Sequence, residues 1–477
     1  MIPRGARHAV LGVLLAAVAS ADTGQDRALA RRFFAEARAV SDADGGRLWG
    51  QSLYGPILLV DPVERRLYAN QAAADGDAGL EARDGVFVGS LPPRGVLAVN
   101  SAQEWAGTRW TTVTWQSIPR GTPRRKALWA HEMFHRIQPE LAASGASPAC
   151  AHLDEGPGRF WLRLELRALS AALLKSGSAR KAAARDALVF RAARHARFEG
   201  AAEDERQLEL NEGLAQYTGV RLSSIPNESI AAWVARRICD DESHEGSDPI
   251  WAVRRLEGDW APVSFTRTFP YLTGPAYAVL LDELAPAWRA TIGPDFDLSA
   301  GVGARLEFVR PADLEFEARR RGATYESWVV EADEAQRRRA MEEQRADYRR
   351  RLVDGPRVSL PLRGRRDLMV KPHEITTLDK DLRVYRTLEA QAIWGKLEVS
   401  AGGVLAHLHP NGVPRELVVP GPASPAPGRQ VWAGNGWVLQ LVDGWSLGPG
   451  EREGDLLLVE TTPRDDHGQG TGRSHRP

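Results

Sequence analysis

The chain has 477 residues, and its 62 lysine and arginine residues balance its 62 aspartate and glutamate residues, so its formal net charge is zero. This balance gives no electrostatic reason to expect nucleic acid as a partner. Hydrophobic residues make up 43% of the chain and charged residues 26%, which is ordinary for a folded protein and excludes a disordered one. The length predicts two or three domains.

Residues 1–21 have the pattern of a secretory signal peptide. Arg4 and Arg7 precede an apolar run from Ala9 to Ala19, and Ala19-Ser20-Ala21 forms a small-x-small cleavage site. The apolar run is too short to cross a bilayer, which needs about 20 apolar residues. We therefore expect cleavage near Ala21 and a secreted or periplasmic chain that has no stable membrane anchor after the signal is removed.

The chain contains two cysteines, Cys150 and Cys239. An oxidising compartment outside the cytoplasm would permit one disulfide between them. The sequence leaves open whether they pair, because it does not give the distance between the two residues.

Residues 22–119 predict a small sheet that follows a short helix near Ala28–Ala39. Short runs rich in β-branched and aromatic residues alternate here with Gly, Pro, Asn and Asp. The expected strands are Ile57–Asp61, Arg66–Ala69, Val86–Val88, Val96–Val99 and Trp110–Ile118.

A helix with two histidines one turn apart follows the last of these strands. Thr122 is the expected cap, Pro123 suits the first helical position, and no breaker occurs before Pro139. Within it, Ala130-His131-Glu132-Met133-Phe134-His135 contains the pattern H-E-x-x-H. His131 and His135 share one helix face, so their imidazoles can converge on one zinc ion, with the Glu132 carboxylate beside them.

Residues 120–354 are expected to be mainly helical, and residues 356–462 to form a separate small β domain. Apolar residues at helical spacing predict helices at Phe160–Lys175, Ala182–Ala196, Glu203–Thr218, Ser229–Ile238, Ala276–Leu284 and Tyr325–Leu352. Strand-like runs follow Gly355-Pro356, and residues 463–477 are polar enough to be a disordered tail. The fold class is therefore α+β, with a small N-terminal sheet, a mainly helical catalytic domain and an all-β C-terminal domain.

A catalytic zinc ion needs a third protein ligand besides two histidines. Glu212, in Asn211-Glu212-Gly213-Leu214-Ala215, is the first candidate, and Glu155 is the second. Pro157 closely follows Glu155 and would interrupt the helix that a ligand glutamate usually occupies, which favours Glu212. Glu165 and Asp186 are candidate acceptors for a ligand imidazole, or plain ion-pair partners.

These segments resemble the gluzincin metallopeptidases, in particular the aminopeptidase N and glycyl aminopeptidase branches. The resemblance rests on His131-Glu132-x-x-His135, on Asn211-Glu212-Gly213-x-Ala215, and on Pro270-Tyr271-x-x-Gly274. It covers roughly residues 110–285. It implies a zincin-like catalytic domain, Zn²⁺ held by His131, His135 and Glu212, Glu132 as the general base, and Tyr271 as the donor that stabilises the oxyanion.

The chain also departs from the pattern of that family. The interval between His135 and Glu212 is longer than in aminopeptidase N, so the helices between Phe160 and Ala196 would be an insertion. Arg136 is charged where the family has an uncharged residue, and the G-x-M-E-N exopeptidase segment is absent. Aminopeptidase activity is therefore not expected.

The sequence thus predicts a secreted zinc metallopeptidase that acts on a peptide or protein. An extended substrate would pair with the open edge of the strand Trp110–Ile118. The alternative is a non-catalytic gluzincin-like binding protein whose metal site is structural or lost. The presence of Glu132 beside both histidines favours the enzyme, because a structural zinc site needs no general base.

Overall fold

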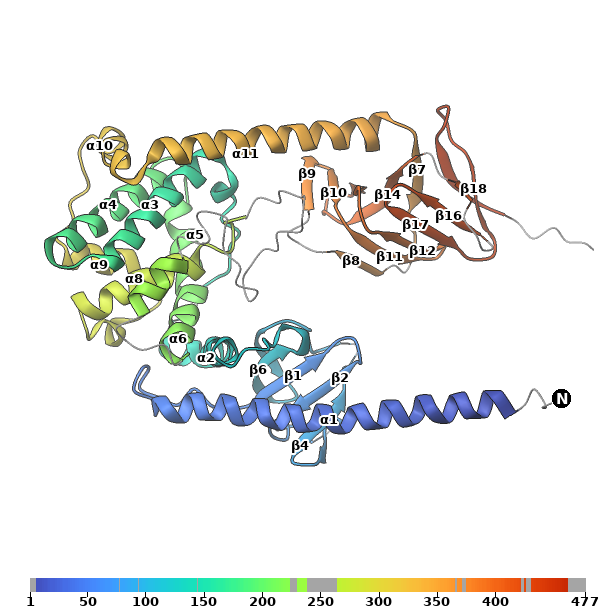
Figure 1. Ribbon diagram of the computed structural model, residues 1–477, viewed down its shortest axis with the longest axis horizontal. Helices are drawn as coiled ribbons and strands as arrows, with labels where there is room; N and C mark the ends of the chain where they lie inside the picture. The colour runs from blue at the N-terminus through green and yellow to red at the C-terminus, as the bar shows by residue number, and fades with distance from the viewer. Residues whose placement is uncertain are drawn as a thin grey trace, which may run out of the picture. The chain divides into compact units, whose positions relative to one another are not determined.

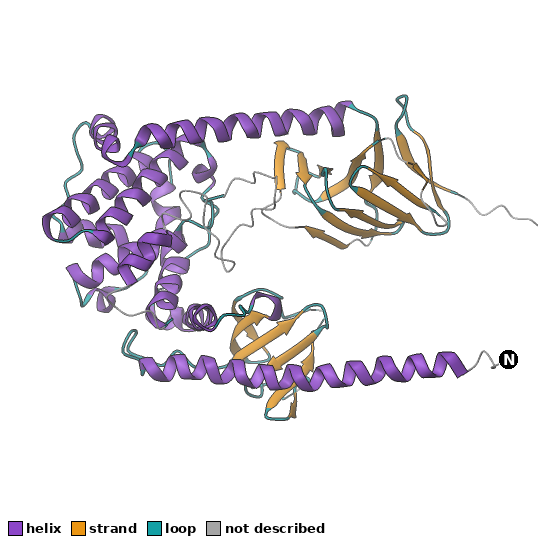
Figure 2. Ribbon diagram, viewed as in Figure 1, coloured by secondary structure: helices purple, strands orange, loops and turns teal. Residues whose placement is uncertain are grey.

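A computed structural model of the protein describes residues 6–76, 78–92, 94–143, 145–223, 230–237, 264–364, 367–370, 375–421, 424–425 and 430–461, with side chains from Gly24 onward except at 424–425. The chain divides into two units, Met1–Glu334 and Ala335–Pro477. This division falls inside helix α11 (Ser327–Tyr348), whereas we expected a boundary near Gly355-Pro356. Both units combine helix and strand (Figure 2), which is compatible with the predicted α+β class.

The first unit contains one six-stranded sheet. Its strands are β1 (Ile57–Asp61), β2 (Arg66–Ala69), β3 (Glu81–Arg83), β4 (Val86–Ser90), β5 (Ser101–Trp105) and β6 (Thr108–Thr114), in the order β3-β4-β2-β1-β6-β5. Strands β1 and β6 are parallel, and the other neighbours are antiparallel. The alternation of side chains divides the sheet between two cores: Leu58, Val60 and Trp110 belong to one, and Ile57, Leu59 and Val113 to the other.

Three of the predicted strands differ from the observed ones. The expected strand Val86–Val88 continues to Ser90, and side-chain hydrogen bonds explain the other two differences. The segment Val96–Val99 is not a strand, because the Gln103 amide pairs with the backbone N–H and C=O of Leu97, each at 2.9 Å. Strand β6 ends at Thr114, whose backbone N–H donates to Asn100 Oδ1 at 2.9 Å. The chain then continues into the 3₁₀ turn η1 (Trp115–Ser117), so the predicted strand Trp110–Ile118 was too long.

The rest of the first unit, where the structure describes it, is mainly helical. Its helices are α1 (Ala6–Asp44), α2 (Thr122–Ile137), α3 (Gly156–Leu174), α4 (Gly177–His195), α5 (Ala201–Leu208), α6 (Leu214–Leu222), a segment over 230–237, α8 (Pro270–Leu284), α9 (Leu298–Arg305) and α10 (Leu314–Gly322). Short helical turns are η2 (Gln138–Leu141), η3 (Ala151–Asp154), η5 (Trp288–Thr291) and η6 (Ala323–Tyr325), and η4 (Glu209–Gly213) is a π-helical turn. No helix in the described part of the chain combines the length and apolar character needed to cross a membrane.

The motif helix α2 is largely buried and packs against α1, α6 and strands β5 and β6 (Figure 1). Glu36 of α1 accepts two hydrogen bonds from Arg125, at 2.7 and 2.8 Å. The N-cap position is Gly121 and not Thr122, whose hydroxyl accepts a hydrogen bond from Arg125 instead. Proline in the first turn still pre-forms the helix, as expected. The helix places both histidines of the motif between the sheet and α6.

The predicted helix Glu203–Thr218 is α5, η4 and α6 in succession, and it continues through Gly219 to Leu222. A Cβ at Gly219 would lie 2.9 Å from the backbone oxygen of Ala127. Glycine at this position therefore allows α6 to approach the motif helix closely, a packing role that the local sequence pattern does not reveal.

The second unit is a β-sandwich. Its strands are β7 (Arg357–Pro361), β8 (Asp367–Val370), β9 (Ile375–Asp379), β10 (Leu382–Tyr385), β11 (Leu388–Ala392), β12 (Gly395–Val399), β13 (Val404–Leu408), β14 (Pro414–Pro420), β15 (Ser424–Pro425), β16 (Val431–Gly434), β17 (Trp437–Leu441), β18 (Trp445–Pro449) and β19 (Leu456–Glu460). They form two sheets, β18-β19-β7-β14-β13-β10-β9 and β15-β16-β17-β12-β11-β8.

The two sheets of the second unit enclose one core, to which Trp394, Leu397 and Leu417 belong. The opposite face of the seven-stranded sheet is covered by Tyr348 of α11 and Leu352 of the π-helical turn η7 (Arg349–Asp354). The expected disordered tail, 463–477, lies outside the described residues.

Candidate active site

The structure brings together three side chains that the sequence predicts as metal ligands. His131 Nε2 lies 3.1 Å from His135 Nε2, and Glu212 Oε2 lies 3.5 Å from the first nitrogen and 3.6 Å from the second. The His131 side chain is 3% exposed, whereas those of His135 and Glu212 are 11% and 20% exposed. The three ligand atoms therefore converge at one point that solvent reaches from one side.

Glu212 reaches the histidines from the π-helical turn η4. A π turn inserts an extra residue into a helix, and such turns are frequent at functional sites. Glu155, the other candidate ligand, lies exposed at the start of α3 and is not part of the cluster. Of the two candidates, Glu212 is the one that the fold brings to His131 and His135.

The Glu132 carboxyl is buried beside this cluster, with 2% of the residue exposed. Burial raises its pKa, against the lowering effect of His131 and His135 and of a hydrogen bond from Asn100. Asn100 Oδ1 accepts hydrogen bonds from the backbone and side chain of Thr114, both at 2.9 Å, so its amide nitrogen is the donor toward Glu132. Among the described residues, Glu132 Oε2 has no hydrogen-bond partner.

Tyr271 lies at the start of α8 and approaches the cluster from the side of Glu212. Its hydroxyl donates to Glu212 Oε2 at 2.8 Å, and its ring stacks on that of His131 with 5.9 Å between centroids. Burial and the negative charge of Glu212 raise the pKa of Tyr271, so the phenol remains a hydrogen-bond donor at neutral pH.

When no metal is bound, Glu212 carries a negative charge and His135 a positive one. Burial would raise the pKa of Glu212, but hydrogen bonds from His131 and His135 outweigh it and hold that pKa well below its usual range. Burial would lower the pKa of His135, but its hydrogen bond to Glu212 and the Glu212 charge together raise it to about 9. The metal-free site is therefore an imidazolium paired with a carboxylate.

Helices α3 and α4, which we interpreted as an insertion, support the turn that carries Glu212. Arg191 of α4 makes hydrogen bonds to Glu165 of α3 and to Glu209 of η4, and Glu209 also accepts from Thr273 of α8. All four side chains are buried. Paired charges of this kind are costly to break, because removal of one partner leaves the other charge buried and uncompensated.

Among the described residues, the partners of Glu165 and Asp186 do not include the two histidines. Glu165 is bonded to Arg191, Arg194 and the Tyr277 hydroxyl, and Asp186 to Arg321 and Tyr325. Both are therefore ion-pair partners, the second of the two interpretations that the sequence allowed. The amide that accepts from His135 Nδ1 is Gln138, at 2.6 Å.

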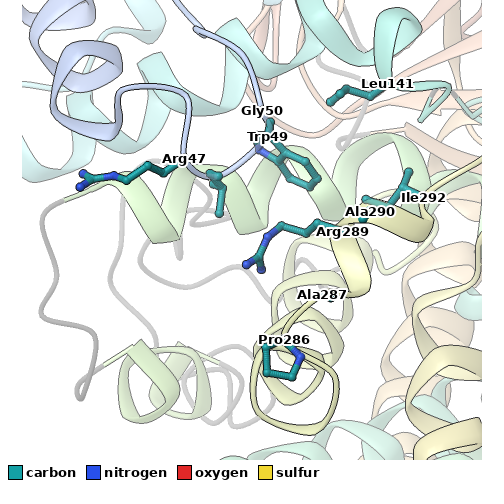
Figure 3. A pocket seen from close by; sticks show the side chains of 10 residues that line it. Arg47, Trp49, Gly50, Leu141, Pro286, Ala287, Arg289, Ala290 and Ile292 are labelled. Atoms are coloured by element: carbon teal, nitrogen blue, oxygen red, sulfur yellow. The ribbon is translucent and has the colours of Figure 1, made fainter.

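A pocket of about 340 Å³ is lined by Arg47, Trp49, Leu141, Arg289 and Ile292, among others (Figure 3). The described residues that line it include none of the five candidate site residues. Arg289 is engaged by Asp282 and the Tyr217 hydroxyl, and Arg47 by two backbone carbonyls. This pocket therefore offers no second chemical centre.

The sequence left the pairing of the two cysteines open, and its expectation of an open edge on the strand Trp110–Ile118 is wrong. Cys150 is buried, and Cys239 lies outside the described residues. Strand β6 is flanked by β1 and β5, so it has no open edge for a peptide. The edge of the sheet beside α2 is instead β5, which the sequence did not predict.

Comparison of the chain with family models, with curated proteins and with solved structures finds no match.

Proposed function

We propose that the protein is a secreted zinc metallopeptidase of the gluzincin type, in which His131, His135 and Glu212 hold the metal. The spacing of the donor atoms supports this proposal. Ligands placed about 2.0–2.1 Å from a tetrahedral zinc ion lie about 3.3–3.4 Å apart, and the three separations here are 3.1, 3.5 and 3.6 Å. Two imidazoles and one carboxylate form the donor set of a catalytic zinc site that keeps one position open.

The observation that most favours catalysis is the buried Glu132 carboxyl. A buried carboxylate oxygen that lacks a hydrogen bond is costly, about 1–3 kcal/mol or more, and in native proteins it calls for a functional explanation. A structural metal site would not require this group. Burial also raises its pKa, which makes the carboxylate a stronger base than an exposed one.

A bound zinc ion would polarise the substrate carbonyl and acidify a water molecule. In the proposed hydrolysis, a Glu132 carboxylate oxygen accepts a proton as that water attacks the carbonyl carbon. Glu132 then returns the proton to the leaving amine as the C–N bond breaks. Tyr271 donates a hydrogen bond to the carbonyl oxygen as negative charge develops on it.

The substrate class we propose is an extended peptide. Strand β5 is the edge of the sheet and packs beside α2, so its outer backbone groups can pair with a peptide strand near the site. The export that residues 1–21 indicate would place this activity outside the cytoplasm.

The test is Glu132→Gln, which conserves volume and removes the base. We expect hydrolysis of a mixed peptide substrate to fall by about 10² or more, while zinc content stays at the wild-type value because Glu132 is not a ligand. Glu140→Gln, at an exposed position just after α2, is the matched control and should hydrolyse normally. Normal hydrolysis by Glu132→Gln would contradict the assignment.

A further inference from the structure

Gln138 connects His135 to the turn that carries Glu212. The residue directly follows α2 and is 3% exposed. Its amide nitrogen donates to the backbone oxygens of Leu210 and Asn211, at 3.3 and 2.8 Å, and its amide oxygen lies 2.6 Å from His135 Nδ1. Backbone oxygens only accept, so the amide nitrogen must face them and the amide oxygen must face the imidazole.

This orientation determines which histidine nitrogen can bind a metal. An amide oxygen is only an acceptor, so His135 Nδ1 must carry a proton and donate it. When His135 is neutral, its lone pair is then on Nε2, the atom that faces His131 and Glu212. A partner on the second ring nitrogen is the usual means of fixing the tautomer and direction of a ligating imidazole.

We propose that Gln138 is a positioning residue that sets the second histidine and the third ligand relative to each other. The oxygen of the Gln138 amide fixes the His135 ring. The nitrogen of the same amide holds the carbonyls of Leu210 and Asn211, the two residues before Glu212. Arg191 and Thr273 hold the opposite side of the turn η4 through their hydrogen bonds to Glu209. Gln138 supports η4 on the side that faces α2. This proposal rests on the metal site of the proposed function.

Two substitutions distinguish the bond that Gln138 makes to His135 from the bonds that it makes to the carbonyls of Leu210 and Asn211. Gln138→Met has a similar volume and makes neither hydrogen bond. Gln138→Glu keeps an oxygen acceptor for His135 Nδ1 and loses the donor to the carbonyls. Gln116→Met is the matched control, because it removes an amide of the same kind whose hydrogen bond goes to Asp61, at 2.9 Å, and not to a candidate ligand.

The measurement is zinc affinity of the full chain by chelator competition without substrate, together with the Tm of the metal-free protein. We expect Gln138→Met to weaken zinc binding by about 10–100-fold, Gln138→Glu to recover only part of that loss because it keeps the bond to His135 and loses the bonds to the carbonyls, and Gln116→Met to bind as wild type does. The Tm of Gln138→Glu confirms that a folded variant is being compared.

Wild-type affinity in Gln138→Met would overturn the proposal. Equal losses in Gln138→Met and Gln138→Glu would also overturn it, since the bond to His135 would then contribute nothing. Failure of the proposed function is a different result, because in that case the wild-type chain itself would take up no zinc.

Discussion

Gly213 and Gly274 contact each other backbone to backbone: a Cβ on residue 274 would lie 2.3 Å from the Cα of Gly213. Gly213 follows Glu212 in η4, and Gly274 lies one turn after Tyr271 in α8. The two segments that resemble gluzincin motifs are therefore in direct contact through their glycines. This contact brings the Tyr271 hydroxyl within hydrogen-bonding distance of Glu212.

Gly274→Ala should force α8 and η4 apart, since neither backbone can yield to a Cβ at that distance. Overpacking of this kind typically costs about 1–3 kcal/mol, and we expect zinc affinity to fall as well because Glu212 moves with its turn. Denaturant unfolding of the metal-free chain measures the first effect and chelator competition the second.

Gly301→Ala is the control for this substitution. Gly301 also lies in a helix, α9, but a Cβ there would meet the side chains of Leu281 and Phe296 at 3.4–3.9 Å, which are ordinary contacts. It should be neutral or stabilising by up to about 1 kcal/mol. Equal stability of Gly274→Ala and wild type would contradict the close contact.

Tyr271→Phe should lower the rate when it is measured at saturating zinc, where metal content is equal to wild type although the variant also loses the bond to Glu212 Oε2. Loss of one oxyanion donor typically lowers kcat by about 10² to 10³, with little change in KM, because the interaction exists only in the transition state. The matched control is Tyr277→Phe, which removes a hydroxyl bonded to Glu165 at 2.7 Å in the buried ion network. That variant should lose stability and keep its turnover. Wild-type turnover in Tyr271→Phe would remove Tyr271 from the mechanism.

Zinc affinity should rise with pH until about pH 9. The pKa of His135 in the metal-free site is about 9, so below that pH zinc must displace one proton, and affinity should change about tenfold per pH unit. Competition titrations from pH 6.5 to 9.5 measure this slope. A slope of zero would show that His135 is already unprotonated.

The ion pair between His135 and Glu212 makes the metal-free chain less stable at high pH than at neutral pH. The pKa of His135 is raised on folding, so its contribution is complete below pH 6.5 and is lost as pH rises through 9. Glu212→Gln removes the charged partner and should flatten this decline. Unfolding of both metal-free proteins at pH 7 and pH 9.5 provides the comparison.

The sequence was most informative where a local pattern determines local structure. Strands β1 and β2 have the bounds that their apolar runs predicted, and the H-E-x-x-H segment lies on a helix as its breaker-free run predicted. The approach of Glu212 to the histidines was expected from the family resemblance. No periodicity could have placed a residue so distant in the chain.

Residues that act through tertiary contacts were missed for a physical reason. Gln138 matters because its amide meets the carbonyls of Leu210 and Asn211, and nothing near it in the sequence marks that partnership. Strand β5 reads Ser-Ala-Gln-Glu-Trp and contains no buried residue, so it lacks the alternation that identifies a strand. The π turn that carries Glu212 likewise has no sequence signal of its own.

The most direct test of the central claim is the zinc content of the purified full-length chain, measured for wild type, Glu212→Ala and Glu155→Ala after exposure to a micromolar chelator. We predict one zinc per chain in wild type and in Glu155→Ala, and loss of zinc in Glu212→Ala. A wild-type value well below one that does not rise when zinc is added, or retention by Glu212→Ala with loss by Glu155→Ala, would contradict the proposed site.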